Sequence, residues 1–285
     1  MNIIKSYKRG LLCASYNWKL IILLYLMNLF LMLLAFGPMS NLFKNIFGNN
    51  LAIESFSNGF NYTTFMDMVN NHGEAFNIAV IQIIAFLIPY LLWSIFSSGG
   101  IVEVAKNYSL RSSLYIFWKG AASYFFRYSR LSIYVLIILG LVGFILIKIF
   151  LKDGLSPFAF YSENILITRF WWVLTIFIII AFFVATFRDI TKVIVAYNDE
   201  EMIISQSLYT AFKRTFTIRY LLLSLLNVII LILVFGLYLF LKSILSNALI
   251  PLVIISQLFL VIRITYRIVR LGSLEQQFKL EQENH

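Results

Sequence analysis

The residues best suited to enzymatic chemistry lie mainly in one short stretch of this sequence. The segment "DMVNNHGE" brings Asp67, His72 and Glu74 together, and such side chains bind divalent metals or transfer protons. A catalytic zinc, however, needs three protein ligands with matched geometry, and one histidine beside two carboxylates is more typical of solvated surface. Asp189 is the other candidate for a lipid-acting enzyme, which ranks third among the functions considered. We expect no catalytic residue, no metal site and no cofactor.

The binding of phosphate is a second kind of chemistry that the sequence offers. The segment "FWKGAASYFFRYSRL", residues 117–131, places basic side chains among aromatic ones, as in a site for nucleic acid or for anionic lipid headgroups. Arg188 and Lys192 are four residues apart and share one face of a helix, and Asp189 beside them can pair with their charges. The residues predicted to bind lipid headgroups are Lys119, Arg127, Arg130, Arg188, Lys192, Arg214 and Arg219.

Polar residues inside apolar stretches indicate a third possibility, a path across a membrane. An ion-coupled transporter is expected to carry a carboxylate in the middle of a span, and these stretches hold none. Polar side chains in such stretches more often form hydrogen bonds to neighbouring helices. The residues that would line a path are Asn28, Gln82, Pro89, Asn227, Pro251 and Gln257.

The composition determines which elements must position these residues. Of the 285 residues, 61% are hydrophobic and 13% are charged, and the mean hydropathy is +0.86. A soluble domain is about 45–50% apolar and about 25% charged, so these values indicate an integral membrane protein. The single cysteine, Cys13, excludes an internal disulfide framework and a metal cluster held by several thiolates.

Six stretches are long and apolar enough to span a membrane, which takes about 20 residues. They are residues 19–38, 76–98, 131–151, 169–188, 219–241 and 247–267. Alternation with a period of two is absent from them, so the predicted fold is all-α, with six transmembrane helices. Outside the spans we expect a long outer loop at residues 39–75 and a polar cytoplasmic tail at residues 271–285.

The distribution of Lys and Arg predicts the orientation of the chain. Of the 23 such residues, 18 lie on one side of the predicted membrane, and the other side holds only Lys44, Lys148, Lys152, Arg169 and Lys242. Cytoplasmic loops are enriched in Lys and Arg, so both termini are predicted to be cytoplasmic. The net charge of +10 then lies at the cytoplasmic membrane surface, where anionic lipid supplies the counter-charge. We therefore expect no nucleic-acid partner.

Three similar basic and aromatic segments precede the first, third and fifth spans. Such a composition predicts an amphipathic helix that lies in the membrane interface and then turns into the bilayer, which we call an elbow. The predicted elbow segments are residues 1–18, 101–130 and 190–218. A shift of 89 residues superimposes Ile101 on Ile190 and Arg130 on Arg219, which indicates a repeated unit of one outward and one inward span.

Parts of the sequence resemble a known group of proteins. The segments "SGGIVEVAKNYS" and "FWKGAASYFFRYSRL", and then "FRDITKVIVAYNDEE" and "AFKRTF", are similar to poorly characterised bacterial six-span membrane proteins. That group is similar in plan to the membrane domain joined to some glycerophosphodiester phosphodiesterases. Members more often carry Arg than Lys at the position of Lys192. The resemblance covers residues 95–225, through Gly99, Gly100, Phe117, Gly120, Phe126, Arg127, Asp189 and Lys192.

The resemblance implies the six-helix fold and a role in the cell envelope or in membrane remodelling. This sequence contains no phosphodiesterase catalytic domain, so that activity is not implied. The favoured hypothesis is a non-enzymatic, multi-pass protein of the bacterial cytoplasmic (inner) membrane that binds anionic lipid, or an unknown protein partner, through its elbows. The alternative is a permease or flippase-like conduit for an amphipathic solute or lipid.

Overall fold

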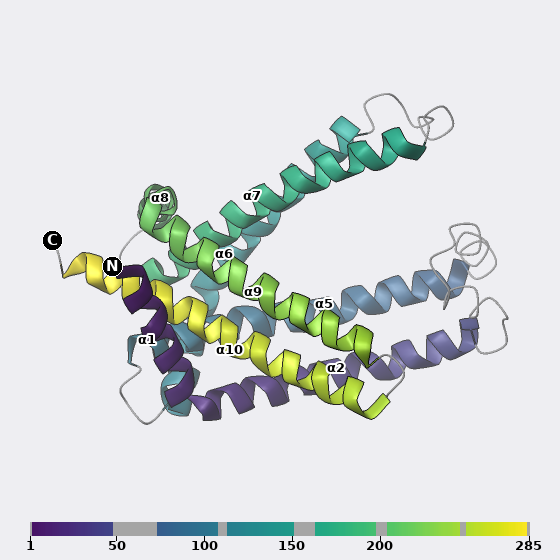
Figure 1. The fold of residues 1–285 in the computed structure, drawn as a ribbon, viewed down its shortest axis with the longest axis horizontal. Coiled ribbons are helices and arrows are strands. Elements are labelled where there is room, and N and C mark those ends of the chain that lie inside the picture. Colours follow the sequence, from purple (N-terminus) through teal and green to yellow (C-terminus); the bar gives the residue numbers. More distant parts are fainter. Residues whose placement is uncertain are drawn as a thin grey trace. The chain divides into compact units, whose positions relative to one another are not determined.

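The computed structural model describes most of the chain as helix. The described residues are 2–47, 73–107, 113–150, 163–197, 204–245 and 249–283. They belong to two compact units: unit 1 comprises Met1–Ile21 and Ile95–His285, and unit 2 comprises Ile22–Ser94. The helices are α1 (Asn2–Tyr16), α2 (Trp18–Phe47), α5 (Gly73–Lys106), α6 (Ser113–Phe150), α7 (Glu163–Tyr197), α8 (Ile204–Thr215), α9 (Ile218–Ile244) and α10 (Leu249–Gln282) (Figure 1).

Six of these helices contain a stretch that is long and apolar enough to cross a membrane. The stretches are Trp18–Phe36, Val80–Lys106, Leu114–Ile149, Trp171–Tyr197, Ile218–Ile244 and Ile250–Gln282. No strand occurs in the described ranges. The predicted all-α fold with six membrane-spanning helices is therefore confirmed.

Unit 2 contains most of α2 and the greater part of α5. Pro89 lies inside α5, and the helix continues through it to Lys106. Pro is tolerated in membrane helices because side chains, water and small local adjustments satisfy the freed carbonyl. Residues 39–47, expected to begin the outer loop, belong to α2, and residues 48–72 of that loop lie outside the described residues.

The first and third elbows contain separate helices, α1 and α8, each ending at a residue that favours a turn. Asn17 separates α1 from α2; its side-chain amide donates to the Cys13 carbonyl (2.8 Å), and its own carbonyl accepts from the Leu20 amide (2.9 Å). Thr217 occupies the corresponding position before α9, and its carbonyl likewise accepts a hydrogen bond from the Tyr220 amide, three residues later (3.0 Å). Asn and Thr are poor interior helix residues, because their side chains compete for the backbone.

The second elbow differs from the other two. Residues 113–150 form the single helix α6, which runs from the basic aromatic segment into the apolar span without a break. No Asn, Gly or Pro stands at the border near Arg130, so nothing in the local sequence ends the helix there. Residues 101–106 and 190–197, assigned to the second and third elbow segments, are the last turns of α5 and α7.

Small residues allow each elbow to pack closely on the end of a span. On α1, Ser6, Gly10 and Ala14 recur at intervals of four and are buried. A Cβ atom at Gly10 would lie 2.5 Å from the Val269 carbonyl oxygen of α10, so the two backbones are nearly in contact. Small residues at this spacing let membrane helices approach closely. Figure 1 shows α1 beside the last turns of α10.

In the other two elbows, too, small residues allow close packing on the end of a span. On α8, Ser207, Ala211 and Thr215 are buried at intervals of four, and this helix packs on α7. A Cβ atom at Gly120 of α6 would lie 2.2 Å from the Glu103 side chain of α5. The second and third elbow segments thus pack on the span that precedes each of them, and α1 packs on α10. This order is expected of three equivalent units.

The last turns of α10 are buried among the neighbouring helices of unit 1. The segment expected to be a polar tail continues α10 as far as Gln282, and its residues 271–278 are buried. Ser273, Glu275, Gln276 and Gln277 are among them. Other helices supply hydrogen-bond partners to two of them: the Ser6 hydroxyl donates to the side-chain oxygen of Gln277 (3.1 Å), and the Tyr197 hydroxyl donates to Glu275.

Candidate functional site at the basic ends of the helices

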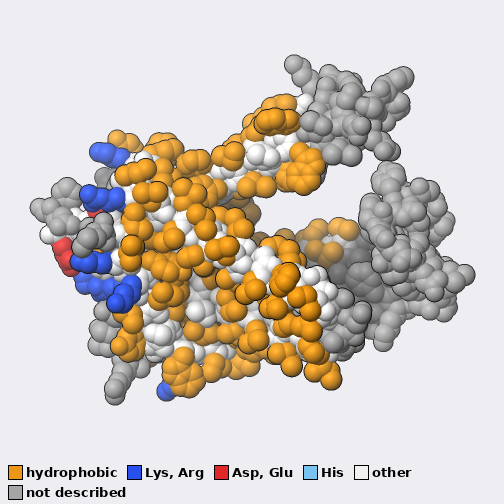
Figure 2. All heavy atoms as spheres, viewed as in Figure 1, with side chains coloured by type: hydrophobic (Ala, Val, Ile, Leu, Met, Phe, Trp, Pro, Cys, Tyr) orange, Lys and Arg blue, Asp and Glu red, His pale blue; other side chains and the backbone are white. Residues whose placement is uncertain are grey.

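Lys and Arg side chains gather at one end of unit 1, where α5, α7 and α10 end and α6 and α9 begin. We call this the basic end. Figure 2 shows these side chains near α8 and the last turns of α10, whereas hydrophobic side chains cover most of the visible face elsewhere. The chemistry available to unit 1 is therefore concentrated where its helices meet.

Asp189 of α7 is the centre of a charged cluster at the basic end. It is 3% exposed and pairs with three cations. Its Oδ1 atom lies 3.1 Å from Arg188 Nε and 3.9 Å from Lys192 Nζ, and its Oδ2 atom forms an ion pair with Arg270 of α10. Burial disfavours a lone carboxylate strongly, and the surrounding cations offset that cost. We call Asp189, Arg188, Lys192 and Arg270 the Asp189 cluster.

The hydroxyl of Ser98 extends this cluster to a third helix. Its oxygen accepts a hydrogen bond from Lys192 Nζ (3.0 Å) and another from Arg267 of α10 (2.7 Å). Ser98 is fully buried near the end of α5. Residues of α5, α7 and α10 are thus joined by polar contacts at one place.

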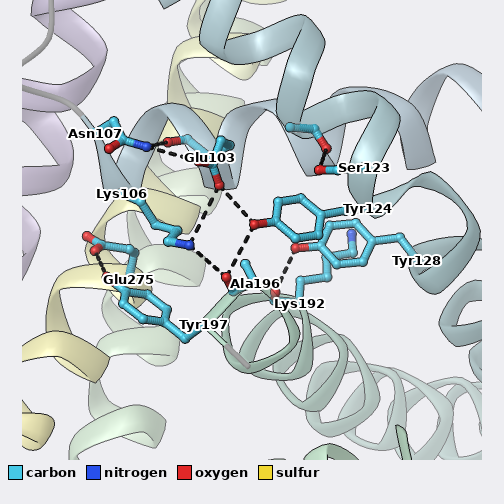
Figure 3. Close-up of polar contacts among 11 residues, drawn as sticks. Glu103, Lys106, Asn107, Ser123, Tyr124, Tyr128, Lys192, Ala196, Tyr197 and Glu275 are labelled. Carbon is cyan, nitrogen blue, oxygen red and sulfur yellow. Dashed lines mark hydrogen bonds and ion pairs between the residues drawn. The ribbon is translucent and has the colours of Figure 1, made fainter. Parts of the chain in front are cut away.

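A second network surrounds Glu103 of α5 (Figure 3). The Tyr124 hydroxyl of α6 donates to Glu103 (2.9 Å) and also lies 3.2 Å from the Ala196 carbonyl of α7. Lys106 lies 3.7 Å from the same carboxylate and donates to that carbonyl (2.7 Å). Asn107 donates to the other Glu103 carboxylate oxygen (3.0 Å).

The end of a helix explains why a lysine and a tyrosine converge on one carbonyl. Because α7 ends at Tyr197, the carbonyl of Ala196 has no partner within its own helix. Lys106 supplies a positive charge there, which also interacts favourably with the helix dipole. One turn earlier, the buried Tyr128 hydroxyl donates to the Lys192 carbonyl (2.6 Å). The Glu103 network therefore fixes the end of α7 against α5 and α6.

Two further tyrosine–glutamate pairs attach α10 to its neighbours. The Tyr197 hydroxyl of α7 donates to Glu275, and the Tyr220 hydroxyl of α9 donates to Glu281 (3.0 Å). Arg214 of α8 lies 3.7 Å from the same Glu281 and stacks over the Phe278 ring. Together with the apolar cluster around Ile190 and Ile194 of α7, these contacts hold the basic end together.

The seven residues predicted to bind headgroups divide into two groups. Lys119, Arg130 and Arg219 are exposed, and Arg127 is half-buried. The others lie in the polar networks: Lys192 is 7% exposed, and Arg188 and Arg214 form the ion pairs described above. The structure therefore brings Arg188 and Lys192 together, as their spacing predicts, but places them against Asp189.

The six residues predicted to line a path have separate environments. In unit 1, Asn227 is buried and donates to the Leu223 carbonyl of its own helix (2.8 Å), and Pro251 and Gln257 are half-buried. In unit 2, Asn28 and Gln82 are half-buried and Pro89 is exposed.

The enzymatic candidates of the outer loop are only partly described. Asp67 and His72 lie outside the described residues, and Glu74 is exposed in the first turn of α5. Asp189, the other candidate, carries the ion pairs of its cluster. Within the described ranges, no group of three His, Cys, Asp or Glu side chains could hold a metal ion.

Several residues of the networks were not predicted to be functional, among them Ser98, Glu103, Tyr124, Arg270 and Glu275. One signal pointed to part of this set: Arg263, Arg267 and Arg270 recur at intervals of four and three, which places them on one helix face. The partners of these residues are distant in sequence, so no local pattern identifies them.

The fold and the polar networks together define a helical, multi-pass membrane protein. No known protein family, curated protein or solved structure matches the chain. The resemblance to six-span bacterial proteins therefore stays a prediction.

Proposed function

We propose that the chain is a non-enzymatic protein of the bacterial inner membrane whose basic end faces the cytoplasm and binds anionic lipid headgroups. The observation that supports this most is the outer surface of the elbows, where exposed basic and aromatic side chains alternate. Interfacial helices bind membranes in this way, with aromatic rings below the headgroups and cations among them.

The helix α8 shows this arrangement most clearly. Its buried stripe of small residues faces α7, whereas Tyr209, Phe212 and Lys213 are exposed. Phe216 and Arg219, which follow the helix, are exposed as well. A water-facing helix would not carry Tyr209 at 73% exposure and two phenylalanines above 50% together. The membrane interface accommodates both the rings and the cations.

The basic aromatic start of α6 presents a similar surface. Trp118 and Phe126 are exposed at 44% and 74%, and Lys119 and Arg130 are exposed beside them. A Lys or Arg near an anionic membrane surface contributes about 1 kcal/mol. The exposed residues Lys119, Arg130 and Arg219 are therefore the main headgroup contacts, with Arg127 beside them. Arg188, Lys192 and Arg214 hold the helices together in this proposal.

Spin-labelled lipids test the proposal in membranes of phosphatidylcholine and phosphatidylglycerol. We expect labelled phosphatidylglycerol to be enriched at the protein boundary over labelled phosphatidylcholine, and the enrichment to fall as salt is raised. The double variant Lys119→Gln/Arg219→Gln should lose much of this selectivity. The matched control is Lys148→Gln/Lys242→Gln, which removes two exposed cations from the opposite ends of α6 and α9.

Equal loss of selectivity in the two double variants would contradict a role for the elbows. The same vesicles test the alternative hypothesis of a conduit. Protein-dependent movement of labelled lipid between the leaflets would replace the present proposal with that one.

A further inference from the structure

The Asp189 cluster contains more positive than negative charge. In the part of the chain that the structure describes, Arg188, Lys192 and Arg270 form ion pairs with one carboxylate, that of Asp189. Both oxygens of that carboxylate are used, one by Arg188 and Lys192 and the other by Arg270. A cluster of three cations around one anion, close to a membrane border, is complementary to a further anion.

Arg188 is oriented so that it can bind such an anion. Its Nε atom contacts Asp189 Oδ1, and its side chain is 36% exposed. The two terminal nitrogens of the guanidinium make no hydrogen bond or ion pair with the rest of the described chain. They form the edge of a planar fork that matches two oxygens of a phosphate. Asp189 thus holds the guanidinium in place without occupying that edge.

Arg270 gives the cluster a second accessible guanidinium. It pairs with the opposite oxygen of Asp189, and its side chain is 23% exposed. Lys192, with a side chain 8% exposed, lies behind the carboxylate and adds positive charge. Both arginines therefore keep exposed surface while their ion pairs with Asp189 remain in place.

The position of Arg188 along α7 matches the level of lipid phosphates. The apolar run of α7 ends at Phe187, and Arg188 is the first charged residue after it. A membrane helix places its border residues at the headgroups, where phosphate is the abundant anion.

We propose that Arg188 and Arg270, positioned by Asp189, bind one phosphate group. The ligand is either a phospholipid headgroup or a free phosphate, since both present the same oxygens to the two guanidinia. This site goes beyond the elbow surfaces: it is saturable, holds one phosphate and needs no membrane surface.

The test uses the full chain in a neutral detergent and follows its unfolding temperature. The probes are dihexanoyl phosphatidylglycerol, dihexanoyl phosphatidylcholine and inorganic phosphate, each at constant ionic strength. A ligand that binds the folded state raises this temperature with a dependence on concentration that gives its affinity. We expect saturable stabilisation by phosphatidylglycerol and weaker stabilisation by phosphatidylcholine, because the choline ammonium compensates the charge of its own phosphate. If inorganic phosphate acts at a similar concentration, the ligand is a free phosphate.

Arg188→Gln is the decisive variant, because Asp189 retains Arg270 and Lys192 and the fold is expected to persist. We expect it to weaken binding about tenfold, the effect of losing charge-assisted hydrogen bonds. Arg188→Lys should also weaken binding, because it keeps the charge but not the fork. The control is Arg263→Gln on α10, an exposed arginine with no ion pair among the described residues. It should change the affinity less than twofold.

Two outcomes would overturn the proposal. One is the absence of saturable stabilisation by both phosphatidylglycerol and inorganic phosphate, and the other is equal weakening in Arg188→Gln and Arg263→Gln. The double variant Lys119→Gln/Arg219→Gln should leave this binding unchanged, so the elbow proposal and this one can fail separately.

Discussion

The two ends of the same helices in unit 1 differ in how they are stabilised. Near the basic end, Tyr220, Leu223 and Asn227 of α9 are at most 1% exposed. Further along that helix, Leu233 and Phe240 are 67% and 61% exposed. Both stretches of the helix are rich in apolar residues, so hydrophobicity alone does not explain the difference. What differs is that small residues, tyrosines and charges at the basic end contact other helices closely, whereas an added Cβ atom at Gly140 or Gly236 would meet no atom within 4 Å.

The difference between the two ends follows from the properties of the membrane as a solvent. Lipid tails are as apolar as leucine, so two apolar helices gain little by leaving lipid for each other. Close backbone packing and buried polar contacts are then the main causes of association. Both occur at the basic end, whereas the opposite halves of α6 and α9 carry large aliphatic side chains suited to lipid. Substitutions at the basic end should therefore change stability and side-chain accessibility strongly. Equivalent substitutions at the opposite end should change them little.

The largest expected difference is in the reactivity of thiols. Burial, with a smaller effect of the Glu275 charge, raises the pKa of the Cys13 thiol to about 12, so the thiol stays protonated between pH 7 and 9. The thiolate is the reactive form, and an exposed cysteine has a pKa of about 8.5. Alkylation of Cys13 by iodoacetamide at pH 7.5 should be roughly 10³-fold slower than that of an exposed cysteine.

The matched comparison for Cys13 is Ser243→Cys at the opposite end of α9, in a Cys13→Ala background. Ser243 is exposed. Mass spectrometry of the alkylated protein over time gives both rates. Comparable rates for the two cysteines would mean that α1 does not stay packed on α10.

Among the effects on stability, the largest is expected for Asp189→Asn. The substitution leaves three partly buried cations without their carboxylate, which costs about 3 kcal/mol of unfolding free energy. Chemical unfolding in detergent measures it. Adding Arg270→Gln should recover part of the loss, because one cation is removed. Simple additivity of the two substitutions would show that the ion pair contributes little.

Gly10→Ala should destabilise the protein by about 2 kcal/mol through overpacking. The new Cβ atom would lie 2.5 Å from the Val269 carbonyl oxygen, and backbone atoms of two packed helices cannot easily move apart. Gly236→Ala in α9 is the control, since no atom lies within 4 Å of its added Cβ. It should leave stability unchanged or raise it slightly, because alanine favours helix. Similar effects at the two glycines would remove the distinction between the ends.

Tyr124→Phe should lower the free energy of unfolding least, by about 1 kcal/mol, which is the typical contribution of one hydrogen bond. The change removes the bond to Glu103, while Lys106 still satisfies the Ala196 carbonyl. Tyr134→Phe, at an exposed position further along α6, is the control and should have no measurable effect. Thermal unfolding of the two variants beside the unmodified protein measures the difference.

The spans could be predicted from sequence because their cause is local. A run of apolar residues such as the one that ends at Phe187 must form a helix in lipid, whatever its neighbours, since every backbone group needs a partner within the segment. Asn17 and Thr217, which end the turns before α2 and α9, act locally as well. The six spans follow from such segments alone, and so do the breaks that separate α1 from α2 and α8 from α9.

The direction in which polar side chains point could not be predicted from sequence. Lys119 and Lys192 are both lysines in the basic segments next to a span, yet one is exposed and the other is buried. Lys192 is buried because Ser98, 94 residues away, faces it. Likewise, residues 271–278 read as a polar tail, because their partners on α1, α7 and α9 are not adjacent in the chain.

The sequence by itself determined the class of protein, the spans and the excess of positive charge, because each depends on composition within about 20 residues. Only the tertiary structure decided which of those charges face outward and which join α5, α7 and α10. That choice depends on contacts between side chains far apart in the sequence, such as Arg270 with Asp189. A buried charge is stable only where such a partner lies beside it.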